Sequence, residues 1–303
     1  MKLAYLSSAS ALGLLAAIGQ SYAAPDMSGV IELNGSFGTT NQHNFFAGKG
    51  ADDPYSFGAK AKGYWPLSPD LHLQIDLFAQ QTDHIMVQHG GEGWPSTDAT
   101  ADGAAIHLLH PLGAYARVGV AGSIWTNEVF DISNPRGKLD VNYGLAAGEG
   151  QYFGTNWTVT GQAGYFGNMA CDRCFLALRD GEFIRGKARY YLNDNTALTA
   201  EALQMWGNFN DTFFSNKSLQ STNLSLQAEH KLDTSPFSGF LGVTYERTAV
   251  DWFSTSSVQT TAVVFGLKYY YGQPTVQANE QTGAELDTPQ FGSALPLAGI
   301  LHF

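Results

Sequence analysis

The chain has 303 residues and a formal net charge of −11 at pH 7; only 14% of its residues are charged, whereas 13% are aromatic and 34 are glycine. The negative charge argues against a nucleic-acid partner, because binding a phosphate backbone requires clustered Lys and Arg side chains. So few charges beside so many aromatic residues are unusual in a water-soluble domain, where about a quarter of the residues are charged. Beyond the first two dozen residues, no window reaches the roughly 20 continuous apolar residues of a membrane helix, which excludes helical membrane architecture.

The first 23 residues have the pattern of a secretory signal peptide. Lys2 supplies a positive start, residues 11–18 are apolar, and Ser21-Tyr22-Ala23 forms a small-x-small cleavage site. A transmembrane anchor is the alternative, but the segment is too short for one and no stop-transfer charges follow it. We therefore expect export and a mature chain that begins near Ala24.

Residues 24–271 are dominated by an alternation in which every second residue is apolar. Phe265, Leu267 and Tyr269 share one face of an extended segment, whereas Gly266 and Lys268 share the other. A helix would scatter both sets around its circumference, so this period of two predicts β-strands. We predict about twelve strands, near residues 29–38, 55–65, 71–81, 102–110, 114–126, 139–150, 156–166, 182–192, 196–208, 220–232, 239–253 and 257–271.

The predicted connections alternate in length along the chain. Short turns rich in Pro, Gly, Asn and Asp follow the even-numbered strands, at residues 66–70, 111–113, 153–154, 193–195 and 234–236. Longer segments follow most odd-numbered strands, such as residues 39–54, 83–101 and 167–181. Transmembrane barrels pair short periplasmic turns with longer external loops, so this register predicts an up-and-down antiparallel barrel with both termini in the periplasm.

A soluble β-sandwich also alternates and is the alternative fold. A sandwich would carry exposed Lys and Glu on the face opposite its core, whereas here that face is rich in Gly, Ala, Ser and Thr. Aromatic residues also gather at predicted strand ends, where a membrane interface would lie. They are Tyr64-Trp65, Trp125, Tyr165-Phe166, Tyr190-Tyr191, Trp206 and residues 269–271. Both observations favour the barrel.

With these strands, the chain resembles the porin-like outer-membrane β-barrel proteins of Gram-negative bacteria. The resemblance includes a terminal aromatic residue, Phe303, preceded by Leu301, Leu297 and Leu295 at alternate positions. It implies an outer-membrane location, contact with membrane lipids and lipopolysaccharide, and recognition by the barrel-insertion machinery. The stretch 272–303 follows the last predicted strand. It is either a periplasmic or lumen-filling tail, or it contains a closing strand at 295–303.

The charged residues of the predicted strands share the parity that faces the lumen. An Arg or Lys side chain that faced the middle of the bilayer would cost about 2 to 4 kcal/mol, so the shared parity supports the register. We predict that the lumen is lined by Lys60, Lys62, Arg117, Arg185, Lys187, Arg189, Glu201, Glu229, Glu246 and Lys268, with Glu32 and Asp76 beside the Lys60–Lys62 pair. This lining predicts a passive channel for small polar or anionic solutes. In the alternative interpretation, the same charges pair with one another inside a non-conducting structural or adhesion barrel.

Cys171 and Cys174 are the only cysteines, and they lie on a predicted external connection. A disulfide that holds this connection together is the favoured interpretation, because no second Cys or His pair with metal-site spacing accompanies them. Acidic residues also crowd the longer connections, but solvated charge accounts for them and we name no metal site. The sequence indicates no cofactor.

An outer-membrane lipid-modifying enzyme is the remaining alternative. Such an enzyme needs a Ser or His nucleophile-base pair on the outward face, oriented by a third polar group. His107 is predicted to point inward, and His84 and His89 lie on a connection without a clear Ser and Asp partner. We therefore expect no enzymatic activity.

Overall fold

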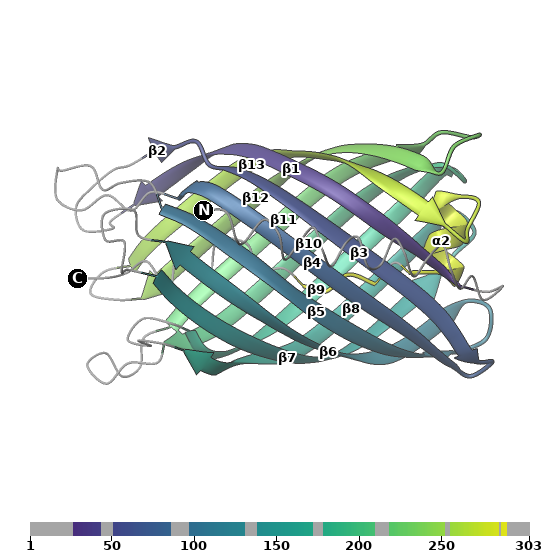
Figure 1. Ribbon diagram of the computed structural model, residues 1–303, viewed down its shortest axis with the longest axis horizontal. Helices are drawn as coiled ribbons and strands as arrows, with labels where there is room; N and C mark the ends of the chain where they lie inside the picture. The colour runs from purple at the N-terminus through teal and green to yellow at the C-terminus, as the bar shows by residue number, and fades with distance from the viewer. Residues whose placement is uncertain are drawn as a thin grey trace.

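The computed structural model describes residues 27–43, 51–85, 97–130, 138–171, 178–209, 218–251, 255–284 and 286–289. These residues form long antiparallel strands that tilt around a common axis, with one short helix at one end (Figure 1). The strands are β1 (Ser28–His43), β2 (Ala51–Asp52), β3 (Tyr55–Ser68), β4 (Leu71–Ile85), β5 (Thr97–Pro111), β6 (Ala116–Phe130), β7 (Lys138–Phe153), β8 (Trp157–Cys171), β9 (Leu178–Asn193), β10 (Thr196–Phe209), β11 (Ser218–Lys231), β12 (Phe237–Asp251) and β13 (Thr255–Tyr271); the helix is α2 (Val276–Thr282).

Each long strand pairs with its neighbours in sequence, and β13 pairs with β1 to close the sheet. The closing ladder runs without a register shift from Gly29↔Tyr271 to His43↔Ser257. The two-residue strand β2 pairs only with β1 and lies outside the ring. The predicted all-β architecture is therefore confirmed as a closed antiparallel barrel of twelve strands.

The strands are longer than the sequence predicted. Residues 39–43 continue β1, Thr97 begins β5 and Leu178 begins β9, although all three positions were assigned to connections. Strands of 14 to 17 residues exceed the 9–11 residues that cross the hydrocarbon core. The ladder therefore extends beyond the membrane, where polar residues pair as well as apolar ones. Period-two hydrophobicity reports only the membrane-facing part of each strand.

The short connections meet at one end of the barrel, which we call the short-turn end. They are residues 69–70, 112–115, 154–156, 194–195 and 232–236. The first described residues of β1 and the end of β13 lie at the same end, because Gly29 pairs with Tyr271. In outer-membrane barrels this end faces the periplasm.

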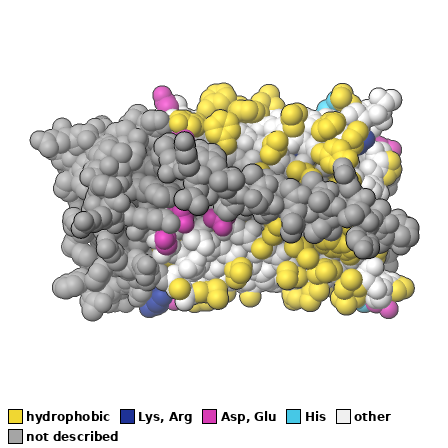
Figure 2. Space-filling model, in the orientation of Figure 1, with side chains coloured by type: hydrophobic (Ala, Val, Ile, Leu, Met, Phe, Trp, Pro, Cys, Tyr) yellow, Lys and Arg dark blue, Asp and Glu magenta, His cyan; other side chains and the backbone are white. Residues whose placement is uncertain are grey.

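The barrel wall is apolar outside and charged inside. Leu226 and Leu241 each have 60% of their surface exposed, whereas Arg185 and Glu229 are buried at 6% and 1%. Hydrophobic side chains cover much of the visible described wall, and the charged side chains in this view lie toward its two ends (Figure 2). This arrangement is the reverse of a soluble protein and requires hydrocarbon as the outer solvent. The charged side chains that the sequence predicted to face inward do face inward in the structure.

The predicted aromatic girdle is only half right. Tyr165, Tyr190 and Trp206 point outward and are 51%, 51% and 43% exposed. By contrast, Phe166 and Tyr191 face the lumen and are buried, as are Tyr64, Trp125 and Tyr270. Successive side chains of a strand point to opposite faces, so one member of each adjacent aromatic pair must point inward. Clustering at strand ends alone did not reveal this.

After β13 the chain turns back into the barrel. The turn needs Gly272, which has a φ of +78° and where a Cβ atom would lie 2.1 Å from the Met27 carbonyl oxygen. Helix α2 then begins at Thr275, whose hydroxyl accepts a hydrogen bond from the Ala278 amide at 3.0 Å. Within the described residues, no helix is long and apolar enough to cross a membrane.

Residues 276–284 and 286–289 lie against inward-facing side chains, and we call them the luminal segment. Val276 packs in a buried cluster with Val30, Tyr191, Ala197 and Tyr270. Farther along, Ala284 and Leu286 pack against two further inward side chains, those of Tyr64 and Leu109. Side chains of α2 also cap the short turns, since Gln277 and Gln281 donate to the carbonyls of Thr155 and Gly154. The described part of the tail thus fills the lumen at the short-turn end. The strand considered at 295–303 lies outside the described residues, and the wall closes between β1 and β13.

We expect a charge placed on the outer wall to destabilise the barrel. Leu226 lies near the middle of β11 and points outward. Replacing it by Arg should lower the free energy of unfolding in phospholipid vesicles by about 2–4 kcal/mol, because the guanidinium would enter hydrocarbon. Guanidinium chloride titration measures this loss, and Leu226→Met should cost less than about 1.5 kcal/mol. Equal stability of the two variants would show that position 226 does not face lipid.

Candidate functional site

The centre of the lumen is a network of charges built around strand β9. Arg185, Lys187 and Arg189 occupy alternate positions of β9 and therefore all point inward, where they are 4–6% exposed. Arg185 holds Glu201 of β10 in a two-pronged pair, with Nε to Oε1 at 2.8 Å and Nη2 to Oε2 at 2.6 Å. Arg189 pairs with Glu229 of β11. Bidentate pairs of this kind fix both orientation and charge.

A second chain of charges continues around the wall from Glu229. Lys268 of β13 donates to Glu229 Oε2 at 2.8 Å, and its ammonium lies 3.9 Å from Glu32 of β1. Lys60 of β3 lies 3.9 Å from the other oxygen of Glu32. Contacting charges thus alternate in sign from β9 to β3 through β11, β13 and β1. This part of the network belongs to the wall itself.

Asp287 of the luminal segment brings cations from opposite walls together. Its carboxylate pairs with Lys62 of β3, with Lys187 Nζ at 3.2 Å and with Arg185 Nη2 at 3.5 Å. Strands β3 and β9 are half a turn apart in the closed ring, so this carboxylate lies across the lumen. Burial by itself would raise the pKa of the Asp287 carboxyl, but Lys62, Lys187 and Arg185 outweigh burial and hold the pKa well below its usual range.

The backbone carbonyl of Asp287 is recognised as well as its side chain. It accepts hydrogen bonds from Arg185 Nη1 at 2.8 Å and from Gln162 Nε2 at 3.1 Å. Gln162 lies on β8, where it also donates to Glu149 at 2.9 Å. Two acceptors of one residue, a carboxylate and a carbonyl, are therefore held by donors that belong to the wall.

Glu280 and Arg117 anchor helix α2 closer to the short-turn end. The fully buried Glu280 carboxylate accepts from Arg189 Nη1 at 2.8 Å and lies 3.6 Å from Lys187 Nζ. Arg117 of β6 donates to the carbonyls of Glu280 and Gly283 at 3.1 and 3.2 Å. These carbonyls come from the last turn of a helix, where backbone acceptors lack partners within the helix. A wall cation thus satisfies the end of α2.

His107 lies inside the barrel between two carboxylates. Its Nδ1 is 3.0 Å from Glu149 and its Nε2 is 3.3 Å from Asp76. Asp76 also accepts from the Thr288 hydroxyl at 3.1 Å, so the luminal segment reaches this cluster too. His107 is fully buried and points away from lipid, which matches its predicted inward orientation. His107 thus joins two wall carboxylates, and Asp76 connects this cluster to the luminal segment.

Toward the other end of the barrel, strands β6 to β9 carry aromatic residues on their inward face. Phe183 is the inward residue next to Arg185 on β9, and Phe166 and Tyr143 follow on β8 and β7. Tyr143 stacks on Trp125 at 5.3 Å between ring centroids and meets Phe166 edge-on at 6.3 Å. On this side of the barrel the lining therefore changes along the axis from aromatic to charged. Sequence reasoning assigned only polar and small residues to this face.

The structure gathers nine of the ten predicted lining residues into the networks described above. The tenth residue, Glu246, is also buried and accepts a hydrogen bond from the Thr248 hydroxyl at 3.2 Å. The sequence analysis missed residues that complete the networks: Gln74, Glu149, Gln162, Glu280 and Asp287. An acidic stretch after the last strand, opposite a basic ladder, was the available signal. The predicted disulfide stays a prediction, because Cys174 lies outside the described residues.

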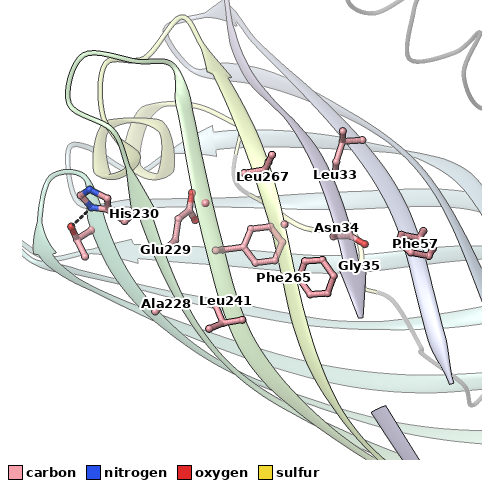
Figure 3. Close-up of a pocket in the computed structure, with 14 residues that line it drawn as sticks. Leu33, Asn34, Gly35, Phe57, Ala228, Glu229, His230, Leu241, Phe265 and Leu267 are labelled. Carbon is pink, nitrogen blue, oxygen red and sulfur yellow. Dashed lines mark hydrogen bonds between the residues drawn. The ribbon is translucent and has the colours of Figure 1, made fainter. Parts of the chain in front are cut away.

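One hollow lies on the outer wall rather than in the lumen (Figure 3). Small residues Gly35, Ala228 and Gly239 line it among the larger side chains of Leu241 and Phe265. Near one edge His230 hydrogen-bonds Thr196 at 2.9 Å, as the dashed line in Figure 3 shows. The Leu241 and Phe265 side chains are exposed on the outer wall, whereas Glu229, which also lines the hollow, belongs to the charged network of the lumen.

Comparison with solved structures identifies the architecture. An outer-membrane channel from Pseudomonas putida F1 is similar at a TM-score of 0.58 and 13% identity, over 84% of this chain and 98% of that chain. The chain has the fold of an outer-membrane β-barrel. The translocator domain of the autotransporter NalP from Neisseria meningitidis is similar to this barrel at a TM-score of 0.47 and 11% identity, over 88% of this chain and 96% of that chain.

The toluene transporter TodX of P. putida is similar to the barrel at a TM-score of 0.44 and 8% identity, over 81% of this chain and 89% of that chain. No protein-family model matches the sequence, and no curated protein matches it. Likeness at these identities establishes the fold alone. What passes through or binds in this outer-membrane barrel must be argued from its own luminal side chains.

We expect the pair between Arg189 and Glu280 to couple the luminal segment to the wall. Both side chains are buried, so removing one partner takes a counter-charge away from the other. A double-mutant cycle with Arg189→Gln and Glu280→Gln, measured by denaturant unfolding in detergent micelles, should give a coupling energy of about 1–3 kcal/mol. Glu280→Gln combined with Asp70→Asn, on an exposed turn, is the matched control and should be additive within about 0.5 kcal/mol. Additivity in the first cycle would contradict the pairing.

Proposed function

We propose that the protein is an outer-membrane channel for the passive diffusion of small polar or anionic solutes, closed in the described state by its luminal segment. The proposal is carried by one observation, which is where the counter-charges of the β9 cations come from. Lys187 pairs with Glu280 and with Asp287, and both carboxylates come from the luminal segment rather than from the wall. When the counter-charges of luminal cations belong to a separate segment, solute anions can take the place of those counter-charges.

The wall does not depend on the luminal segment for its closure. The β1–β13 ladder is continuous, and each neighbouring pair of long strands forms its own ladder. Among the described residues, the luminal segment meets the wall through side chains, through carbonyls that accept from wall side chains, and through a backbone hydrogen bond from Gln277 to Asp194 at 3.0 Å. Displacing the segment therefore breaks ion pairs and leaves the wall intact. The P. putida protein of similar fold is described as a channel, which supports the same function here.

A permanently plugged structural or adhesion barrel is the second candidate. The density of contacts at Asp287 favours it, since three cations and two carbonyl hydrogen bonds hold a single residue. In that case the charged lumen is a satisfied interior and conducts nothing. Ionic conductance separates the two candidates directly.

The proposal includes the route of the chain to the membrane. A signal peptide at residues 1–23 would direct export in a Gram-negative cell and be cleaved before insertion. The insertion machinery would recognise Phe303 and the leucines at alternate positions before it. The outward apolar face would contact membrane lipids and lipopolysaccharide. The disulfide between Cys171 and Cys174 belongs to the same oxidising environment. The alternation of outward apolar and inward polar side chains along the wall supports a location in the outer membrane.

We expect the wild-type protein to show rare ionic openings in planar bilayers. The full-length double variant Glu280→Gln with Asp287→Asn should raise the open probability by about tenfold or more, because two carboxylates that pair with Lys187 become neutral. Openings of this variant should favour anions, since two negative charges that face the basic residues of β9 have been removed. Asp70→Asn on an exposed turn is the control and should leave conductance unchanged.

Charge reversal identifies the strand that sets the selectivity. In the double variant, replacing Arg185, Lys187 and Arg189 by Glu should move the reversal potential toward cation selectivity. An unchanged reversal potential would show that β9 does not form the constriction. If no variant conducts at any voltage, the proposed channel function is wrong and a structural barrel is favoured.

We also propose that the barrel is not an enzyme. His107 is held between Asp76 and Glu149 on the inward face, away from any lipid substrate. Incubation of the refolded protein with phospholipid or lipid A should therefore yield no cleavage product by mass spectrometry. Products that disappear in the His107→Ala variant would overturn this part of the proposal.

A further inference from the structure

Asp287 occupies a site whose donors all belong to the wall. Lys62, Arg185 and Lys187 converge on its carboxylate, and Arg185 and Gln162 donate to its carbonyl. These donors come from β3, β8 and β9, so they stay in place when the luminal segment moves. Their own strand registers and the Arg185–Glu201 pair keep them oriented. The wall therefore carries a preformed receptor for one carboxylate and one further oxygen.

The position of this receptor gives it access to solutes. Its cations come from walls half a turn apart in the ring, so the site spans the lumen. The Asp287 side chain keeps 26% of its surface exposed, whereas the Glu280 side chain is fully buried. The Asp287 side chain is therefore less enclosed by protein than the Glu280 side chain. Glu280 lies deeper and acts as an anchor.

We propose that Asp287 is an internal pseudo-ligand in a binding site for small organic carboxylates that carry a second acceptor oxygen. The inference rests on the proposed function, because it names the solute class of that lumen. In Asp287, two carbon atoms separate the carboxylate carbon from the carbonyl carbon. The solute class is therefore a γ-oxo carboxylate, whose carboxylate binds Lys62, Arg185 and Lys187 while its oxo group takes the hydrogen bonds of Arg185 and Gln162. No covalent bond forms or breaks in this exchange.

The internal ligand weakens solute binding without preventing it. A tethered carboxylate competes at a high effective concentration, so a solute binds the wild-type site only in the fraction of molecules where Asp287 has left. Solute binding and release of the luminal segment are then the same event. A channel built this way opens to the solutes that its lumen recognises.

Equilibrium binding to full-length protein in detergent micelles tests the site. Levulinate is the probe, because it reproduces the carboxylate, the two-carbon spacing and the carbonyl oxygen of Asp287. Titration calorimetry should detect levulinate binding to Asp287→Ala at an affinity at least about tenfold higher than to wild type. Pentanoate lacks the oxo group and should bind more weakly than levulinate, and the uncharged amide of levulinate should not bind.

Matched variants separate the site from general effects of charge. Asp233→Ala removes a carboxylate from an exposed turn and should behave as wild type. Adding Lys187→Gln to Asp287→Ala should abolish levulinate binding. Heat-modifiable gel mobility reports whether each variant is folded, and Asp287→Asn replaces Asp287→Ala if the alanine variant does not fold.

The proposal is overturned if folded Asp287 variants do not bind levulinate, or if they bind its amide or pentanoate equally well. These outcomes are independent of conductance. Binding without ionic openings would preserve the site and remove the channel, whereas openings without levulinate binding would preserve the channel and remove the site.

Discussion

Cations that point into a closed barrel must find their counter-charges inside it, because the other side of the wall is hydrocarbon. Strand β9 places three such cations in a row, and the wall supplies Glu201 to Arg185 and Glu229 to Arg189. The luminal segment adds Glu280 and Asp287, which pair with Lys187 and its two neighbours. An isolated buried charge is costly, so this requirement draws the luminal segment into the lumen.

The same carboxylates connect stability with function. Because they belong to a segment outside the hydrogen-bonded wall, neutralising the cations also fills the lumen at the short-turn end. In the proposed channel, a solute anion would replace such a carboxylate while the charge balance of the lumen is kept. Selection of the solute and opening of the lumen would then rest on one set of donors, on β3, β8 and β9, which the continuous strand ladders hold in place.

Strand number, turn positions and the inward parity of the charges could be predicted because each follows from a local period of two. The Lys62–Asp287 pair could not, since its partners are 225 residues apart and residues 272–289 show no strand period. Phe166 and Tyr191 were assigned to a lipid interface because strand-end position does not distinguish the two faces. The sequence does not reveal which residues form ion pairs across the lumen, because those pairs depend on how the ring of strands closes.

Carboxyl footprinting of the folded barrel tests the central claim most directly. Carbodiimide coupling to a small amine, read by peptide mass spectrometry, reports how accessible each carboxylate is. Glu280 is fully buried inside the lumen, as Glu229 of the wall is, whereas Asp70 lies on an exposed turn. The account predicts that Glu280 is protected to the same degree as Glu229 and becomes reactive only on unfolding. Labelling of Glu280 in the folded protein as fast as Asp70 would contradict it.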